Sequence, residues 1–233
     1  MDYHIFKSML NRYYSRHIGG NNRPVFIDIE ATCPELAEVT AAFPRIRAEF
    51  DQVLAAGREI PRYHDVDPGE AKISDHGAEK WSVYMLDVLG NKPEENRALC
   101  PETCRLLAKV PAVMQAFFSI LDPGKSIPLH EGPYLGYLRY HLGLRVPRHA
   151  PPTLWIADEP YTWREGEAVM FDDSWPHRVE NTSRELRGVL IVDILRPMPV
   201  VPTLVNRLTT QVLVRYTYGR HVADRVRRFK EAA

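Results

Sequence analysis

The segment from His130 to Leu144, His-Glu-Gly-Pro-Tyr-Leu-Gly-Tyr-Leu-Arg-Tyr-His-Leu-Gly-Leu, constrains the fold more than any other part of the chain. After the Gly-Pro turn, the alternation of its side chains predicts one long strand. One face of this strand is apolar and carries Leu138, Tyr140, Leu142 and Leu144. The other face carries Arg139 and His141. Because burying such groups costs free energy unless they have partners, we expect an anion or a metal ion on this face. We therefore place the chemistry of the protein there.

Length, charge and hydropathy exclude several classes of protein. The 233 residues suffice for one core and require no second domain. The 30 basic and 30 acidic residues balance, so we expect no nucleic-acid partner. The longest near-apolar runs, Pro111–Leu121 and Val189–Leu195, are too short to cross a bilayer, and the start has no signal-peptide pattern. We expect a cytosolic protein. The three cysteines imply no disulfide framework.

The chain divides into a helical part and a strand-rich part. Apolar residues recur at helical spacing on both sides of Pro44, and Pro101 suits the first turn of another helix. Residues 63–77 are polar and are predicted to form a loop, followed by a strand from Trp81 to Leu89. From Ala116 onwards, short strands and turns follow one another at intervals of about ten residues. Besides the 130–144 segment, the predicted strands are Phe117–Leu121, Ser126–His130, Thr153–Ala157, Tyr161–Trp163, Ala168–Phe171, His177–Glu180 and Arg187–Leu195.

This order of elements predicts the fold class. Helices followed by about eight short strands with antiparallel turns indicate a mainly β fold with flanking helices, a jelly-roll or cupin-like barrel with an N-terminal helical buttress. We expect a single domain over residues 1–233. Within it, residues 1–115 are mostly helical, residues 116–200 form the jelly-roll core, and residues 201–233 form a helical tail.

Two histidines flank the strand region and are candidate metal ligands. His130 precedes the long strand and His177 follows Phe171-Asp-Asp-Ser-Trp-Pro, so a barrel can bring them face to face. Two neutral imidazoles suit a borderline metal such as Fe(II). The usual third ligand is a carboxylate two residues after the first histidine, but Gly132 occupies that position. Spacing alone favours two structural histidines over a pair of metal ligands.

The motifs around these histidines resemble the aspartyl/asparaginyl β-hydroxylase family. They are His130-x-Gly-Pro, Leu138-Arg-x-His-Leu-Gly-Leu, Gly166-Glu, Phe171-Asp-Asp-Ser with His177, and Arg187 followed by Val192-Asp-Ile-x-x-Pro. The resemblance extends from Trp81 to Pro197. It implies an Fe(II)- and 2-oxoglutarate-dependent dioxygenase with the double-stranded β-helix fold.

The resemblance also implies roles for individual residues. His130 and His177 would hold the iron, and Gly132 matches the hydroxylases of protein Asp and Asn, which lack the carboxylate ligand. Four residues would bind 2-oxoglutarate, with dioxygen as the other cosubstrate: Ser119, Arg139, His141 and Arg187. For the two arginines, the alternative is an ordinary ion pair.

Three acidic residues and three tryptophans near these motifs have less specific roles. Asp172 and Asp173 either orient His177 through its other ring nitrogen or form a turn. Asp193 is expected to make a structural hydrogen bond. The tryptophans Trp155, Trp163 and Trp175 are expected to pack in the core or at its rim.

The sequence does not decide between several classes of substrate. A small molecule, a peptide and a lipid are all possible substrates, and Gly132 favours hydroxylation of the β-carbon of an aspartyl or asparaginyl group. Pro133-Tyr-x-Gly-x-Leu-Arg-Tyr-His favours the alternative, an acyl-chain hydroxylase of the lipid A or ornithine-lipid type. A non-catalytic cupin-like binding module is the alternative from another class. The basic, amphipathic segment 204–230 either lies on an anionic membrane or packs against the barrel as a solvated helix. The sequence does not indicate the oligomeric state.

Overall fold

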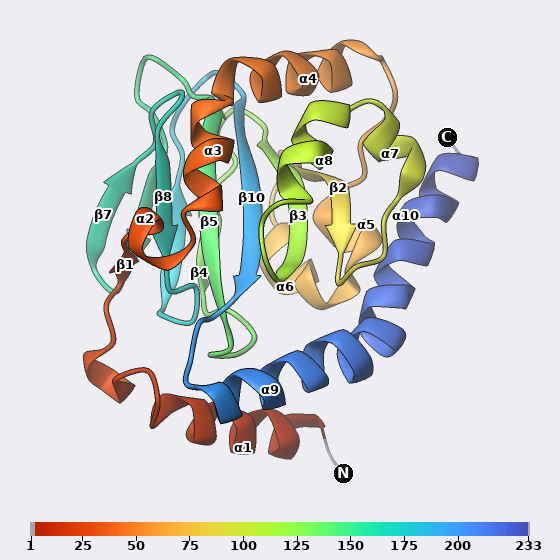
Figure 1. Ribbon diagram of the computed structural model, residues 1–233. Coiled ribbons are helices and arrows are strands. Elements are labelled where there is room, and N and C mark those ends of the chain that lie inside the picture. Colours follow the sequence, from red (N-terminus) through yellow and green to blue (C-terminus); the bar gives the residue numbers. More distant parts are fainter. Residues whose placement is uncertain (1–2, 233) are drawn as a thin grey trace.

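The computed structural model describes residues 3–232, so residues 1, 2 and 233 of the predicted first and last segments lie outside the described residues. Its centre is two antiparallel sheets that face each other (Figure 1). The larger sheet has the strand order β1–β8–β5–β10–β3–β2, and the smaller has the order β4–β9–β6–β7. Helices surround the sheets, so the mainly β, jelly-roll fold class with flanking helices is confirmed.

The strands are β1 Phe26–Ile27, β2 Trp81–Val88, β3 Val113–Leu121, β4 Ile127–His130, β5 Tyr137–Arg145, β6 Thr153–Ile156, β7 Glu159–Thr162, β8 Ala168–Phe171, β9 His177–Glu180 and β10 Arg187–Leu195. The α-helices are α1 Tyr3–Ser15, α2 Ile29–Thr32, α3 Glu35–Ala41, α4 Phe43–Ala55, α5 Tyr63–Val66, α6 Ala71–Ser74, α7 Glu94–Ala98, α8 Pro101–Leu107, α9 Val200–Leu208 and α10 Arg220–Ala232. Two 3₁₀ turns, η1 Gly20–Asn22 and η2 Pro68–Glu70, and one π-helical segment, η3 Thr209–Gly219, complete the chain.

Most strand predictions are confirmed, and β8, β9 and β10 have the predicted bounds. Strand β3 begins at Val113 rather than Phe117, because its first residues still pair with β10, where Val113 lies opposite Ile194. The predicted loop 63–77 is wrong in part, because it contains α5, η2 and α6. Acidic side chains cap these short elements: the Asp65 carboxylate accepts from the Arg62 amide at 2.9 Å, and that of Asp67 accepts from Gly69 at 3.0 Å.

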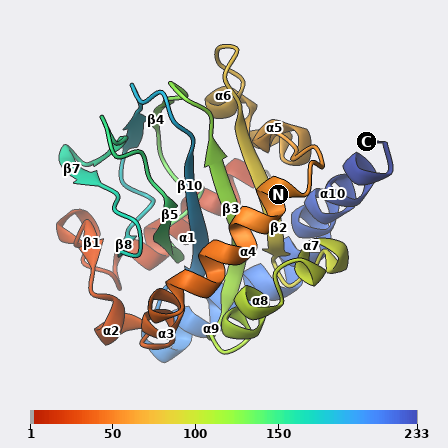
Figure 2. The same cartoon turned by 90° about the horizontal axis from the view of Figure 1, so that it is seen from above.

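The two faces of the larger sheet have different neighbours. Helices α3, α4 and α8 cover the outer face (Figures 1 and 2). Their apolar side chains form one core cluster with the predicted apolar face of β5, which comprises Leu138, Tyr140, Leu142 and Leu144. The inner face of the larger sheet faces the smaller sheet and carries Val189 and Ile191, which belong to a second cluster. Arg139 and His141 lie on this inner face, as the alternation in the sequence predicts.

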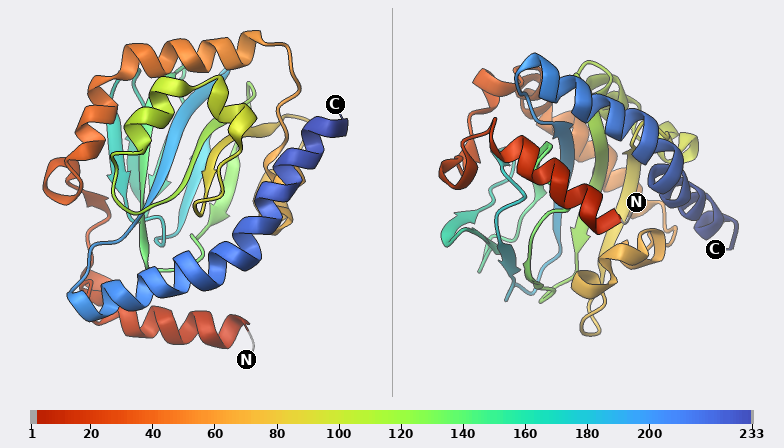
Figure 3. Two further views of the ribbon diagram at one scale, coloured as in Figure 1. Left: turned by 45° about the vertical axis from the view of Figure 1, so that its right-hand side comes forward. Right: turned by 90° about the horizontal axis from the view of Figure 1, so that it is seen from below.

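The chain ends with one long helical run. Segments α9, η3 and α10 follow one another without a break, and α9 lies beside α1 at one end of the sheets (Figure 3). Val222 and Val226 of α10 are buried in the second core cluster. Within residues 3–232, no helix is both long enough and apolar enough to span a membrane.

The close packing of α4 on β10 generates a stability prediction. A Cβ atom at Gly188 would overlap the ring of Phe50. We expect Gly188→Ala to lower the free energy of unfolding by about 1–3 kcal/mol, because the ring has no free space to move into. Urea denaturation of Gly188→Ala, Phe50→Leu and the double variant measures the effect. The double variant should be more stable than the sum of the single changes predicts, and strict additivity would contradict this packing.

Candidate active site

Strands β4 and β9 bring the two candidate metal ligands together. His130 is the last residue of β4 and His177 the first of β9, and the two are directly opposite in the antiparallel pairing. Their ring centroids are 4.1 Å apart. His177 is buried and His130 is half-buried. The antiparallel pairing of β4 with β9 therefore brings together two imidazoles from residues that are distant in the sequence.

Backbone carbonyls orient both imidazoles. The Nδ1 atom of His130 lies 2.8 Å from the Pro128 carbonyl oxygen, and that of His177 lies 2.8 Å from the Trp175 carbonyl oxygen. Each Nδ1 donates its proton to a carbonyl acceptor, so Nε2 is the nitrogen of each ring that could bind a metal ion. Burial and the neighbouring His177 lower the pKa of His130 to about 4, which keeps this ring neutral. Two imidazoles with their Nε2 atoms available in this way fit a divalent metal ion. Among residues 3–232, no group of three or more His, Cys, Asp and Glu side chains forms a metal-binding arrangement.

The side-chain space at Gly132 is filled by other residues. A Cβ atom there would overlap the Asp173 carboxylate and the Tyr137 hydroxyl, and would lie 2.9 Å from the Asp173 carbonyl oxygen. The Gly132 amide donates to that same carbonyl at 2.8 Å, which holds the two segments together. The absence of a carboxylate at position 132 therefore has a steric cause in this structure.

Asp173 lies beside the Nε2 atom of His177. Its Oδ1 atom is 3.3 Å from His177 Nε2, and its Oδ2 atom accepts a hydrogen bond from Tyr137. The hypothesis that Asp173 orients His177 through the other ring nitrogen is wrong, because that nitrogen bonds the Trp175 carbonyl.

Asp172 forms a turn by accepting a hydrogen bond from the Ser174 amide at 3.1 Å. It also pairs with Arg23 at 2.8 Å and with Arg196 at 2.6 Å.

Arg139 has two carboxylate partners. Its Nε and Nη2 atoms donate to the two oxygens of Asp193 at 2.8 and 2.9 Å, and its Nη1 atom donates to Asp173 at 2.9 Å. Asp193 lies directly opposite Arg139 in the pairing of β5 with β10. The ion pair, which was the alternative interpretation of Arg139, is therefore present. It is also the structural bond expected of Asp193.

Arg187, in contrast, has no carboxylate partner among the described residues. Its side chain is 1% exposed, and its Nη1 atom lies 3.2 Å from Ser119 Oγ. Its guanidinium also lies over the ring of Trp163, 4.3 Å from the centroid, and its Nε atom bonds no described residue. Burial lowers the pKa of Arg187 to about 9, because nothing nearby compensates the charge.

His141 lies near Arg187 and offers a second unused donor. The Trp163 indole donates to its Nδ1 atom at 3.3 Å, which places the ring proton on Nε2. That Nε2 atom is buried and has no hydrogen-bond partner in the described part of the chain. Burial and the charge of Arg187 lower the pKa of His141 well below its usual value, so the ring is neutral.

Arg187, His141 and Ser119 thus form a buried cradle of hydrogen-bond donors, which we call the anion cradle. The Ser119 hydroxyl also accepts from the Trp81 indole at 2.9 Å. Phe171 joins the cradle to the histidine pair, since its ring centroid is 4.9 Å from that of His141 and 6.2 Å from that of His177. An unpaired guanidinium with an imidazole N–H suits a carboxylate.

The sequence did not indicate the contributions of Trp81 and Trp163. The alternation of side chains along β2 could have suggested that Trp81 contacts Ser119. Trp81 lies on the same face of β2 as Val83, and Val83 lies opposite Ser119. Trp163 follows the end of β7, where no periodicity applies. It was predicted to pack in the core, and it does so while donating to His141.

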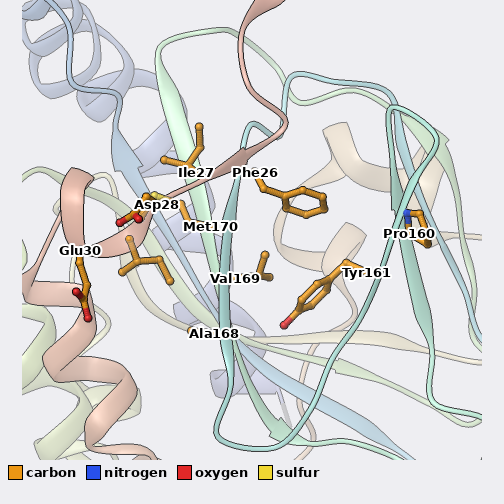
Figure 4. A pocket seen from close by; sticks show the side chains of 10 residues that line it. Phe26, Ile27, Asp28, Glu30, Pro160, Tyr161, Ala168, Val169 and Met170 are labelled. Carbon is orange, nitrogen blue, oxygen red and sulfur yellow. The ribbon is translucent and has the colours of Figure 1, made fainter.

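A separate hollow of about 450 Å³ lies between β1, β8 and β7 (Figure 4). Its lining includes Phe26, Tyr161 and Met170, with Asp28 and Glu30 at one side. None of the candidate site residues lines it.

The lowered pKa values of His130 and His141 predict that the folded protein is sensitive to acid. In the unfolded chain their pKa returns to about 6.5, so that state binds more protons than the folded state between pH 6.5 and about 4. The free energy of unfolding should therefore fall as the pH drops through this range. Each histidine contributes at most about 1.4 kcal/mol per pH unit to this fall. Urea denaturation of His141→Gln at several pH values should show a shallower fall than the wild type. An identical slope would exclude His141 as a contributor.

The filled space at Gly132 predicts that any side chain there is unfavourable. We expect Gly132→Ala to lower the free energy of unfolding by about 1–3 kcal/mol, because the Asp173 carboxylate and the Tyr137 hydroxyl must move. The same change in a Tyr137→Phe background should cost less, since one of the two obstacles is gone. Chemical denaturation of the four proteins measures both costs, and equal costs would show that Tyr137 is not an obstacle.

Comparisons with known proteins agree with these features. Residues 40–197 match the family model described as aspartyl/asparaginyl beta-hydroxylase. The chain is 37% identical over 186 residues to an ornithine lipid ester-linked acyl 2-hydroxylase of Rhizobium tropici, covering 79% of this chain and 65% of that protein. It is 36% identical over 122 residues to the human aspartyl/asparaginyl beta-hydroxylase, covering 50% of this chain and 16% of that protein.

A third relative is the aspartate beta-hydroxylase domain-containing protein 2 of Xenopus tropicalis, which is 33% identical over 164 residues and covers 66% of this chain and 42% of that protein. The matched segment is less than two thirds of the length of each of these three relatives. The family model covers more than half of the chain, including every candidate site residue. The chain therefore belongs to the aspartyl/asparaginyl β-hydroxylase family.

Proposed function

We propose that this protein is an Fe(II)- and 2-oxoglutarate-dependent dioxygenase that hydroxylates an unactivated C–H bond, with dioxygen as the oxidant. The single observation that carries the proposal is the anion cradle, a buried and unpaired Arg187 beside Ser119 and His141, next to the paired imidazoles of His130 and His177. A dicarboxylate needs cationic or N–H donors at its distal end and a metal ion at the other. The proposal includes the single domain and the cytosolic location expected from the sequence.

The residues of the site would divide the work between binding and positioning. His130 and His177 would hold the metal ion, and Arg187, Ser119 and His141 would bind the distal carboxylate of 2-oxoglutarate. When bound, iron and 2-oxoglutarate supply the oxidising power for the C–H bond. Trp163 and Phe171 would limit the access of water to this region, because both side chains are buried around the cradle.

Arg139 would position Asp173 rather than bind 2-oxoglutarate. Because two carboxylates already use its guanidinium, a direct contact with 2-oxoglutarate would require one of them to move away. We propose that Arg139 holds Asp173 beside His177 Nε2, where its carboxylate can accept a hydrogen bond from a group bound at the metal. The cosubstrate contact expected of Arg139 from the resemblance stays a prediction.

The proposed substrate is an aspartyl or asparaginyl group, hydroxylated at its β-carbon. Gly132 supports this assignment, because the hydroxylases of protein Asp and Asn also have glycine there. The second candidate substrate is the acyl chain of a lipid of the ornithine-lipid type. The similarity to the Rhizobium tropici lipid hydroxylase, which covers 79% of this chain, favours it.

The test of the proposal is whether the purified protein with Fe(II) converts 2-oxoglutarate to succinate. We expect turnover by the wild type, and Arg187→Met should lose both turnover and binding. In thermal denaturation, 2-oxoglutarate at a hundredfold excess over its Kd should stabilise the wild type by about 2.7 kcal/mol and leave Arg187→Met unchanged. Arg184→Met, which changes an exposed arginine three residues earlier, is the matched control and should behave as the wild type.

Mass spectrometry separates the substrate classes. A gain of one oxygen on an aspartyl or asparaginyl peptide supports the first assignment, and a gain on the acyl chain of an ornithine lipid supports the second. If the protein neither takes up iron nor turns over 2-oxoglutarate with any substrate, it is a non-catalytic cupin-like binding module and the proposal is wrong.

A further inference from the structure

An apolar stripe runs along the outer side of the C-terminal helices. It consists of Val200, Val201, Leu204, Leu208, Val212 and Tyr216, whose side chains are between 45% and 74% exposed. Apart from Val201, these residues recur every four positions along α9 and η3, and all of them are exposed. The opposite side contains Pro202, Asn206 and Thr210, which are buried. A contiguous exposed apolar surface of this kind indicates a site that binds a membrane, another protein or a ligand.

The segments that form this stripe contain basic residues and no acidic ones. Residues 194–223 contain no aspartate or glutamate, although acidic residues are as frequent as basic ones in the chain as a whole. Residues 3–27, which include α1, also lack acidic residues. Helix α1 lies beside α9 (Figures 1 and 3) and adds the exposed Met9. The exposed arginines Arg12 and Arg207 lie on these two helices.

These two helices also hold a loop of the candidate active site. Asn11 of α1 accepts a hydrogen bond from the Leu135 amide at 3.0 Å, and Asn206 of α9 donates to the Gly136 carbonyl at 2.6 Å. Arg196, just before α9, donates to the Leu135 carbonyl at 2.8 Å. Leu135 and Gly136 belong to the loop that connects His130 and Gly132 with β5. A surface formed by α1 and α9 is therefore fixed directly to the site.

We propose that the stripe of α9 and η3, together with α1, docks this protein on the surface of an anionic lipid membrane. Apolar side chains would enter the interface while arginines meet the lipid phosphates, which is how interfacial helices bind. Tyr216 suits the boundary between headgroups and acyl chains. A second copy of this chain fits less well, because a symmetric dimer through this surface would bring two positive regions together. The proposal does not depend on the substrate, since docking can be measured without turnover.

Co-sedimentation with vesicles tests this inference. The full chain should bind vesicles of phosphatidylcholine with phosphatidylglycerol and bind pure phosphatidylcholine much less. Leu204→Gln combined with Leu208→Gln should reduce the fraction bound about tenfold or more, because two exposed apolar groups are lost. Arg207→Glu should weaken binding, whereas Arg184→Glu, an exposed arginine outside this surface, should not. Thermal denaturation of the variants checks that their fold is unchanged.

Three results would overturn the inference. One is that the wild type binds neither kind of vesicle, and another is that it binds both equally. The third is that the wild type is a dimer in sedimentation equilibrium while the Leu204→Gln, Leu208→Gln variant is a monomer, which would make the stripe an interface between copies. Loss of vesicle binding by this variant with 2-oxoglutarate turnover retained would support docking and leave the proposed activity standing.

Discussion

The guanidinium of Arg139 between the carboxylates of Asp173 and Asp193 is the interaction on which the interior of the barrel depends. It joins β5 to β10 and to the segment before β9, so both sheets meet at one charged group. Burying three charges is costly, and each is tolerable only while the others remain. The arrangement fixes Asp173, which in turn fills the space beside Gly132 and approaches His177. The ion pair is thereby connected to the second histidine through Asp173.

The same barrel contains a second buried arginine with the opposite character. Arg187 has a hydroxyl and an indole ring for neighbours, but no anion among the described residues. A protein that only needed a stable interior would gain by replacing this side chain with an apolar one. The contrast between a compensated Arg139 and an uncompensated Arg187 separates the groups that hold the barrel together from those suited to a ligand.

The sequence predicted the strands well where alternation and turns coincide, as in β8, β9 and β10. It also predicted which face of β5 is polar and that His130 and His177 meet, because antiparallel barrels pair distant strands. It could not predict that Asp173 occupies the space at Gly132, since this depends on contacts between segments distant in the chain. The short helices within residues 63–77 were missed because their stability comes from local caps rather than from apolar periodicity.

The occupied space at Gly132 has a consequence for how such a site can change during evolution. A substitution that introduces a carboxylate at this position would have to displace Asp173 and Tyr137, which already fill the volume it needs. Shortening Asp173 would remove a carboxylate partner of Arg139, and shortening Tyr137 would remove the hydroxyl that donates to Asp173. Replacement of the glycine is therefore disfavoured by the packing of its neighbours, independently of what a metal site would tolerate.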